Sequence, residues 1–398
     1  MRVYFAPNGM ALGHAGRCAP IAKRLMEKGA QVLFSTYGDA VDLVYSLGFP
    51  VVKVPEIKLV EGEDGTIEML QTSIRWPKYV VVFLKQLICE IRNIKRFKPD
   101  VVVSDSRLSP VFASLLLGVP CLLLLHQIKL FIPHKKPLSK IKMKLKALGE
   151  WAILYILWLM WSRSTFVIVP DFPPPYTIAR EHVDVPVKFL RKVKFVGQII
   201  DKLPHELPSK EEAKRMLGFD GRPLIYIGVS GTKVEREAVN RILLDAVSKF
   251  PEKYQVIMSM GNPGEVREVF RKNGVKVYNW VPDRYLVLKA CDLIVSRSGH
   301  NTIAESMYYG VPSVLIPTPA HTEHEMNARS AEAMGVAKVI RQNDLNYETL
   351  LKAINEVLGD GSYRARAELI QKRVLENGSV DLIIREILSL ANFGRKYK

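Results

Sequence analysis

Short apolar runs alternate along the chain with longer stretches of helical periodicity. Helices are expected at 20–28 and 110–117, because a glycine that can end a helix directly follows each segment. The apolar runs of the first half lie at 2–6, 31–35, 99–104 and 121–125. Continuous apolar strands between helices are typical of a parallel sheet buried on both faces, so the pattern predicts an α/β fold.

The pattern is interrupted at 197–211, where prolines and charged residues are typical of a linker, and then begins again. Further strands are expected at 224–227, 256–259, 275–278, 293–296 and 313–316. We therefore predict two Rossmann-like, doubly wound parallel-sheet domains, 1–196 and 212–398, facing each other across a cleft. The last helix is a candidate for packing back onto the first domain.

The composition fits a globular, cytoplasmic protein of 398 residues, which is enough for two ordinary domains. The formal net charge of +17 favours anionic partners, such as nucleotides or a membrane face, although it could also serve solubility. The four cysteines show no spacing typical of disulfides or zinc sites. The chain opens on a strand pattern and has no apolar run long enough to span a bilayer.

A Gly/Ser turn follows the strand expected at 224–227. Its Gly228, Ser230 and Gly231 would let the backbone approach a phosphate at the start of the next helix. An ordinary strand-to-helix turn has the same composition, so this motif alone identifies no ligand.

A second turn, Ser298-Gly299, follows the strand expected at 293–296 and opens a helix. Free amides at a helix start can hold a diphosphate. Glu305 lies farther along this helix, where a carboxylate could accept both hydroxyls of a ribose or could be a buried packing acid. The same segment supplies four further donor-site candidates: Arg297, His300, Asn301 and Thr302.

A third polar turn begins at Pro317 and carries Glu323 and His324 into the following helix. Trp280 and Val281 follow the strand expected at 275–278. The tryptophan could belong to the core.

Together these segments resemble the nucleotide-sugar signature shared by MurG-type N-acetylglucosaminyltransferases and the UDP-glycosyltransferases. The matching residues are Ser298, Gly299, Thr302, Glu305, Pro312, Pro317, Asn327 and Ala328. The resemblance implies a GT-B fold and a UDP-sugar donor. It also implies that Glu305 binds the ribose, that Glu323 and His324 face the donor sugar, and that Trp280 lies where the family cups the base.

Two positions depart from the family pattern. The sugar-facing pair is commonly Asp-Gln or Gln-Gln, whereas this chain has Glu323-His324. Plant-type members carry histidine where Arg297 stands, and an arginine could still pair with phosphate. The identity of the donated sugar therefore stays open.

The turn after the first expected strand carries Gly13-His14 and then Gly16-Arg17. A histidine at the C-terminal end of a strand is placed for proton transfer, although these glycines also resemble a Rossmann phosphate loop. UDP-glycosyltransferases carry Gly-His at this place. The resemblance implies that His14 takes the proton from the acceptor hydroxyl.

Asp105, at the end of the strand expected at 99–104, is the natural partner of His14. A carboxylate on one imidazole nitrogen fixes the tautomer and stabilises the cation formed during proton transfer. Ser104 and Arg107 flank it and are alternatives.

No Asp-x-Asp sequence occurs in the chain. Metal-dependent glycosyltransferases of the other main fold usually use one to hold a divalent ion. We therefore expect an inverting transfer without metal or other cofactor, in which helix amides and a side-chain cation stabilise the diphosphate leaving group.

A basic segment leads into a Trp-rich run between residues 126 and 163. Trp151, Trp158 and Trp161 lie within eleven residues. The basic lead-in consists of Lys129, His134, Lys135, Lys136, Lys140, Lys142, Lys144 and Lys146. This composition favours peripheral contact with an anionic membrane on its inner face, and a buried helix is the alternative. The acceptor could then be a lipid or lipid-linked sugar as well as a small molecule.

Three other functions fit parts of the pattern. A nucleotide-sugar 2-epimerase shares the fold, but the Ser298-Gly299 turn lacks its usual doubled acid. A dinucleotide oxidoreductase needs an acid about 20 residues beyond its loop, for which Asp39 and Asp42 are candidates. A lipid- or polyanion-binding protein would bind without turnover. Nucleic acid is a poor candidate, because basic and aromatic residues interleave only in the Trp-rich segment.

Overall fold

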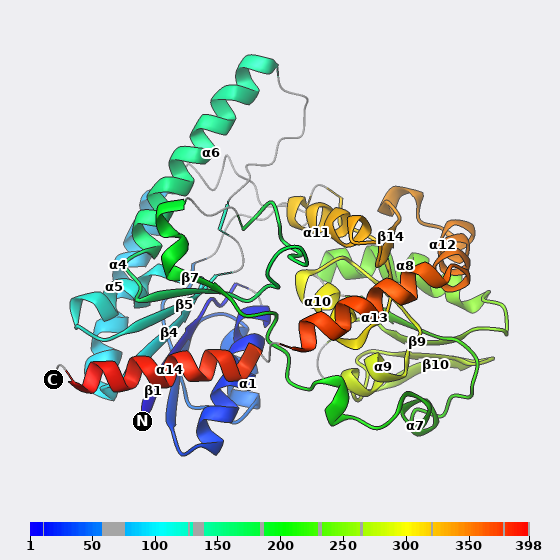
Figure 1. Ribbon diagram of the computed structural model, residues 1–398, viewed down its shortest axis with the longest axis horizontal. Helices are drawn as coiled ribbons and strands as arrows, with labels where there is room; N and C mark the ends of the chain where they lie inside the picture. The colour runs from blue at the N-terminus through cyan, green and yellow to red at the C-terminus, as the bar shows by residue number, and fades with distance from the viewer. Residues whose placement is uncertain are drawn as a thin grey trace.

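The protein, seen in a computed structural model, consists of two α/β domains side by side (Figure 1). The structure describes residues 1–10, 12–57, 76–125, 128–129, 139–183, 187–229, 233–262, 266–319, 321–376 and 379–396. Each domain is built around a seven-stranded sheet with an apolar core on both of its faces. The predicted GT-B-type architecture of two mostly parallel sheets is confirmed.

The first sheet has the strand order β3-β2-β1-β4-β5-β6-β7, and its paired strands run parallel. Its elements are β1 (Arg2–Pro7), α1 (Leu12–Glu27), β2 (Gln31–Thr36), α2 (Ala40–Ser46), β3 (Val51–Lys53), α4 (Trp76–Phe97), β4 (Val101–Asp105), α5 (Leu108–Leu116), β5 (Cys121–Leu124), α6 (Lys140–Trp161), β6 (Phe166–Val169), η1 (Val187–Lys192) and β7 (Val193–Phe195).

The second sheet has the order β10-β11-β9-β8-β12-β13-β14, and only the β10–β11 pair at its edge is antiparallel among the described strands. The elements of this domain are η2 (Pro204–Glu206), α7 (Lys210–Met216), β8 (Leu224–Gly228), α8 (Lys233–Ser248), β9 (Gln255–Ser259), β10 (Glu268–Lys272), β11 (Val275–Tyr278), α9 (Arg284–Ala290), β12 (Leu293–Ser296), α10 (His300–Tyr309), β13 (Ser313–Leu315), α11 (Thr322–Ala333), β14 (Ala337–Val339), η3 (Gln342–Asp344), α12 (Tyr347–Gly359) and α13 (Gly361–Leu375). The chain ends with α14 (Ser379–Lys396).

Both sheets have a topological switch point, where the chain changes the direction in which it adds strands. It lies between β1 and β4 in the first sheet and between β8 and β12 in the second. In open α/β sheets, ligands bind outside the carboxyl ends of the strands at such points. A non-glycine residue with positive φ follows the end of β4 and of β12, namely Ser106 at 57° and Ser298 at 59°. Such backbone strain tends to gather at functional sites.

The apolar runs expected to be strands form β1, β2, β4, β5, β8, β9, β11, β12 and β13, so these predictions are confirmed. The helix expected at 20–28 is confirmed as far as Glu27, but its expected start was wrong, because α1 begins at Leu12 and contains Pro20. The segment with Gly13 and Gly16 is therefore helical, not a turn. A glycine inside a helix costs only about 1 kcal/mol relative to alanine, which the packing of this helix onto the sheet can offset.

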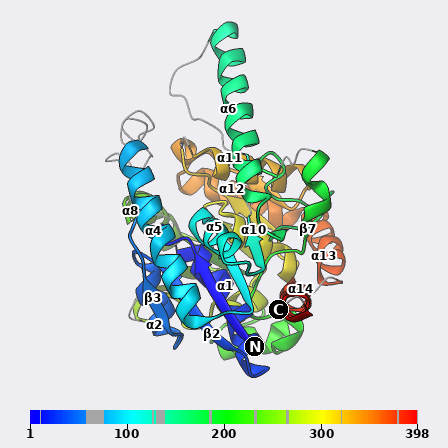
Figure 2. The same ribbon diagram turned by 90° about the vertical axis from the view of Figure 1, so that its left-hand side faces the viewer.

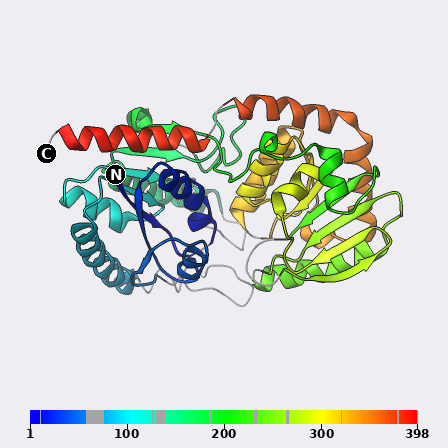
Figure 3. The ribbon, with the colours of Figure 1, turned by 90° about the horizontal axis from the view of Figure 1, so that it is seen from below.

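The last helix crosses back to the first domain. Figures 1 and 3 show α14 lying along this domain next to α1. Ile383, Ile384 and Ile387 are buried in the same apolar cluster as Val3 and Phe5 of β1. The two domains are therefore joined both by the segment after β7 and by the connection between α13 and α14.

Helix α6 stands out from the body of the first domain (Figure 2). Trp158 is completely buried and Trp161 nearly so, whereas Trp151 is 59% exposed. The prediction that all three tryptophans lie at a membrane interface is therefore wrong for Trp158 and Trp161. Both are buried in the core because the C-terminal end of α6 packs onto the sheet. None of the described helices is both long and apolar enough to span a bilayer.

Candidate active site

His14 and Asp105 meet at the switch point of the first sheet. His14 lies in the first turn of α1, and Asp105 is the last residue of β4, directly beside β1. The imidazole Nδ1 lies 2.8 Å from Oδ1 of Asp105. The carboxylate is fully buried, whereas 15% of the imidazole side chain is exposed. The structure thus brings together the two residues predicted to be the base and its partner, although their catalytic roles stay a prediction.

Arg17 is a third member of this cluster. Its Nε and Nη2 donate hydrogen bonds to the two carboxylate oxygens of Asp105, and Nη2 also lies 2.9 Å from Nδ1 of His14. Ser106 donates a further hydrogen bond to Asp105 over 3.0 Å. Burial favours the protonated acid, but the charges of Arg17 and His14 outweigh it and lower the pKa of Asp105 well below its usual range. Asp105 is therefore ionised at neutral pH.

The two alternatives to Asp105 have other partners. Arg107 donates to the buried Glu90 over 2.6 Å and to the carbonyl of Ser35. Ser104 donates to the carbonyl of Arg107 over 2.7 Å. This buried network connects Glu90 of α4 with the end of β2 and with the segment after β4.

The donor-side turn occupies the switch point of the second sheet. Gly299 is the N-cap of α10, so the first amides of this helix have no partner within the helix. Gly228 ends the neighbouring strand β8. Ser230 and Gly231, also predicted to bind the donor, lie outside the described residues. A helix start with free amides between two strand ends is suited to an anion.

Glu305 is buried on α10 and paired with Arg284 at the start of α9. Arg284 also donates to Thr302 over 3.3 Å. Burial raises the pKa of Glu305, and the charge of Arg284 opposes that shift. In the described chain only the Oε2 atom of Glu305 accepts a hydrogen bond, so Oε1 is free to accept one from a ligand.

Arg297, His324 and Ser298 belong to one network under the turn. Arg297 is buried and donates to Gln342 over 2.6 Å and to Thr318. The hydroxyl of Thr318 lies 2.8 Å from Nδ1 of His324, and Ser298 donates to the His324 carbonyl over 2.9 Å. Through these hydrogen bonds Arg297 stabilises the segments next to the turn. Its expected pairing with phosphate stays a prediction.

His324 is neutral at physiological pH. Burial, His321 and Arg297 together lower the pKa of His324 to about 3. His321 caps α11 and stacks on His324 at a ring distance of 4.1 Å. The ring of His324 therefore offers neutral hydrogen bonding and no charge to a ligand.

The first turn of α10 also contacts the other domain. His300 lies 3.1 Å from Asp171, and Asn301 accepts a hydrogen bond from Gln198 over 2.6 Å. Gly197, beside Gln198, has a φ of 79°, and a Cβ there would lie 2.8 Å from the hydroxyl of Tyr308. The turn proposed to bind the diphosphate is therefore in contact with the segment that joins the domains. The sequence analysis identified neither Asp171 nor Gln198 as a site residue.

The remaining predicted residues are divided between the two domains. A Cβ on Gly13 would lie 3.7 Å from the side chain of Asn301, whereas one on Gly16 would meet nothing within 4 Å. Glu323 lies in the first turn of α11, close enough to Arg17 for their charges to attract. Val281 belongs to the core, but Trp280 is 39% exposed and is therefore available to a ligand. Of the two alternatives for Trp280, this exposure contradicts the core position, and its role in covering the base stays a prediction.

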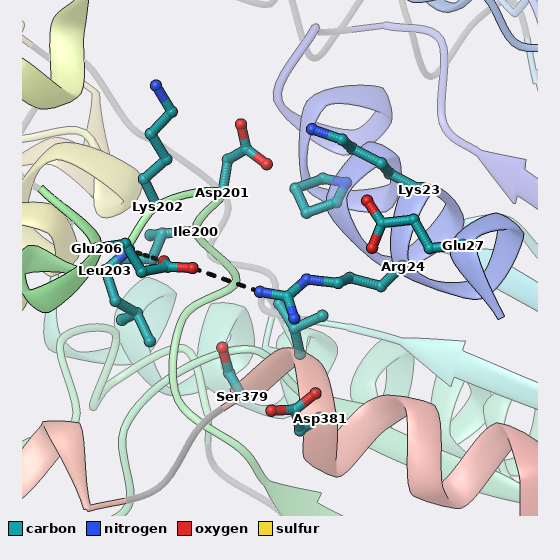
Figure 4. A pocket seen from close by; sticks show the side chains of 12 residues that line it. Lys23, Arg24, Glu27, Ile200, Asp201, Lys202, Leu203, Glu206, Ser379 and Asp381 are labelled. Atoms are coloured by element: carbon teal, nitrogen blue, oxygen red, sulfur yellow. Dashed lines mark hydrogen bonds and ion pairs between the residues drawn. The ribbon is translucent and has the colours of Figure 1, made fainter.

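A hollow at the other end of α1 is separate from this cluster (Figure 4). It lies between the second half of α1, the segment after β7 and the start of α14. Arg24 and Glu206 cross it as an exposed ion pair of 3.5 Å. No residue predicted to bind donor or acceptor lines it.

The sequence of the second domain matches a known family. Residues 229–377 match the glycosyltransferase family 28 C-terminal domain. An uncharacterized glycosyltransferase of Methanosarcina acetivorans is 28% identical over 384 residues, which cover 94% of each chain. This protein is a GT-B glycosyltransferase. That identification argues against an oxidoreductase and against a binding protein without turnover.

The chain is also similar to a MurG-type transferase over part of its length and to solved glycosyltransferases over nearly all of it. A UDP-N-acetylglucosamine--N-acetylmuramyl-(pentapeptide) pyrophosphoryl-undecaprenol N-acetylglucosamine transferase of Caldanaerobacter subterraneus is 30% identical over 188 residues, 44% of this chain and 51% of that protein. The crystal structure of Acinetobacter baumannii MurG matches 98% of this chain and 100% of its own with a TM-score of 0.60 and 16% identity. A Streptomyces glycosyltransferase solved with thymidine diphosphate covers 98% and 99% with a TM-score of 0.61 and 21% identity.

Proposed function

We propose that this glycosyltransferase moves a sugar from a nucleotide-diphosphate donor, UDP in the first instance, to an acceptor hydroxyl with inversion. The observation that carries the proposal is the pairing of His14 with Asp105 at one switch point while the α10 turn and Glu305 occupy the other. The contact between Asn301 and Gln198 links the donor turn to the segment after β7, which joins the two domains. Base and donor site are thus built on different domains, so that each domain can hold one of the two substrates.

The donor would bind mainly to the second domain. The amides at the start of α10 and the positive end of its dipole face a diphosphate, and Oε1 of Glu305 accepts from the ribose. Trp280 would cover the base, and Glu323 with the neutral His324 would face the sugar. The related transferase of Caldanaerobacter is named for a UDP-sugar, which supports uridine over the thymidine of the Streptomyces complex.

The reaction would proceed by direct attack. His14 takes the proton of the acceptor hydroxyl on Nε2 while its Nδ1–H is held by Asp105. The acceptor oxygen forms its bond to the anomeric carbon as the bond to the diphosphate breaks, which inverts that carbon. Preorganised amides of α10 stabilise the charge that develops on the leaving diphosphate.

The first test is to measure the affinity for UDP, dTDP and GDP by calorimetry and the hydrolysis of their sugars in the presence of EDTA. We expect UDP to bind most tightly and one UDP-sugar to be hydrolysed slowly, with the rate unchanged by the chelator. Preference for dTDP would correct the nucleotide. No binding of any nucleoside diphosphate would overturn the proposal.

We propose that the acceptor is lipid or lipid-linked and that α6 contacts an anionic membrane face. Ile141, Leu145 and Leu148 are 74%, 64% and 63% exposed, and their spacing places them on one face of the helix. Lys142 and Lys144 are exposed beside them. Apolar residues flanked by lysines on a projecting helix suit the boundary between head groups and acyl chains.

Replacing Ile141, Leu145 and Leu148 with serine should reduce binding to phosphatidylglycerol vesicles at every salt concentration, because apolar burial is not screened. The variant Lys142→Gln/Lys144→Gln should lose binding mainly at low salt, since the lysines act through charge. Leu369→Ser, which removes an exposed leucine from α13, serves as the control. Equal vesicle binding by all four proteins in a flotation assay would exclude α6 as the contact.

A further inference from the structure

The Nδ1 atom of His14 faces two groups with opposite requirements. Oδ1 of Asp105, at 2.8 Å, needs a hydrogen-bond donor, whereas Nη2 of Arg17, at 2.9 Å, needs an acceptor. Nδ1 carries either one proton or one lone pair, so only one of these contacts can be a hydrogen bond. The choice decides whether Nε2, the other ring nitrogen, has the lone pair that a base requires.

The other contacts of Arg17 favour the contact with Asp105. Arg17 lies three residues after His14 on α1, which places both side chains on the same face of the helix. Its Nε and Nη2 already donate to the two oxygens of Asp105, a bidentate arrangement that fixes the carboxylate plane. Because Nη2 has an acceptor in Asp105, Nδ1 can donate its own proton to the same carboxylate.

We propose that Arg17 is a positioning residue for sugar transfer, which acts through Asp105 to orient His14 and to set its basicity. This inference rests on the proposed function and adds a residue to it. Arg17 does not touch the reacting atoms in this proposal. It clamps the carboxylate that holds the imidazole, and it neutralises most of the negative charge that the imidazole experiences.

The charges around His14 predict the direction in which its protonation should change when Arg17 is removed. Among the residues that the structure describes, the charged and titratable groups around it include Arg17 and Cys18 of α1, Asp105 of β4, and Glu323 of α11, which reaches Arg17 from the other domain. Burial raises the pKa of Cys18 well above its usual value, so this thiol stays neutral. Removing the guanidinium would leave the full charge of Asp105 beside the ring and favour its protonated form.

The experiment compares wild type with Arg17→Met. We expect the acid limb of the transfer-rate profile to move to higher pH by about one unit, because an uncompensated carboxylate within hydrogen-bond distance stabilises a cation to that degree. Transfer at pH 7 should fall by about tenfold, whereas UDP affinity should be unchanged. Arg24→Met, which removes the exposed arginine seven residues farther along α1, is the matched control and should leave the rate and its pH profile unchanged.

A second readout does not depend on transfer. The titration of His14 can be followed directly by NMR of ¹⁵N-labelled histidine rings, with His14→Ala used for assignment. The titration should move to higher pH in Arg17→Met and stay in place in Arg24→Met. If the wild type has no transferase activity but this shift occurs, the proposed function fails and the electrostatic coupling stands. An unchanged titration in a folded Arg17→Met protein overturns the inference.

A double-variant cycle distinguishes positioning from a structural role. If Arg17 acts only through His14, Arg17→Met should cost nothing further in a protein that already carries His14→Ala. Additive losses would show that Arg17 acts by another route and would contradict the proposal. Should Arg17→Met fail to fold, Arg17→Lys keeps the charge but loses the bidentate clamp. That variant should keep the pH profile and lose several-fold in rate, and a wild-type rate would refute the clamp.

Discussion

His14→Ala should lower the rate of sugar transfer by about 10²–10⁴-fold while leaving UDP affinity nearly intact. The expected loss is the usual contribution of a positioned general base in the transition state. UDP affinity should survive because Glu305 and the α10 turn lie in the other domain. Both quantities are to be measured on the same sample, UDP affinity by calorimetry and transfer by release of UDP in the presence of acceptor.

Two further variants sharpen this prediction. His205→Ala removes an exposed histidine from η2 and should transfer sugar at the wild-type rate. Asp105→Asn should also slow transfer, because an amide can hold the wrong imidazole tautomer and no longer stabilises the cation. It also leaves the buried Arg17 without its counter-ion, so its thermal unfolding must be recorded. Wild-type transfer by His14→Ala would remove His14 from the mechanism and make Asp105 the next candidate base.

Glu305→Ala should weaken UDP binding by about 10- to 100-fold, which corresponds to the loss of about 1.5–3 kcal/mol from a hydrogen bond to a charged group. The reason is that Oε1 is the free oxygen of a carboxylate whose other oxygen is held by Arg284. The preorganised ion pair fixes the carboxylate before the ribose arrives. Calorimetric titration with UDP measures this loss, and uracil, which lacks both the ribose and the diphosphate, should bind wild type and Glu305→Ala equally.

The control for this experiment must consider the fate of Arg284. Alanine at 305 leaves that guanidinium partly buried without its partner, which can destabilise the domain. Glu305→Gln keeps an acceptor for Arg284 and should lose less UDP affinity. Glu368→Gln on α13 removes an exposed acid that pairs with Arg364 and should bind UDP like wild type. Unchanged UDP affinity in a folded Glu305→Ala protein would contradict the ribose assignment.

The sequence pointed to the residues of the candidate site in the first domain, but the local structure predicted for them was wrong. Gly13 and Gly16 favoured a turn, and on that basis His14 and Arg17 had no fixed relation. Once α1 is known to begin at Leu12, the spacing of three residues places both side chains on one helical face. The helical spacing of apolar residues from Leu12 onward could have predicted this helix, but the two glycines favoured a turn instead.

Local sequence determined most of the strands and the turn at the switch point of the second sheet. Apolar runs such as Leu224–Gly228 and Leu293–Ser296 form strands because a parallel sheet buries both of their faces, a requirement that each segment meets by itself. The Ser298-Gly299 turn likewise opens α10 by local chemistry, since Gly299 caps the helix. The polar residues of the site therefore stood out at the ends of apolar runs before any tertiary contact was known.

Tertiary structure alone decided which of these residues meet. Arg17 and Asp105 are 88 residues apart, and Gln198 and Asn301 are 103 apart, so no local pattern encodes either contact. The same holds for Trp158, which is buried, and Trp151, which is exposed, although both lie on α6. Burial and charge pairing depend on what packs against a side chain, and that is fixed only when distant strands take their order in the sheet and α14 returns to the first domain.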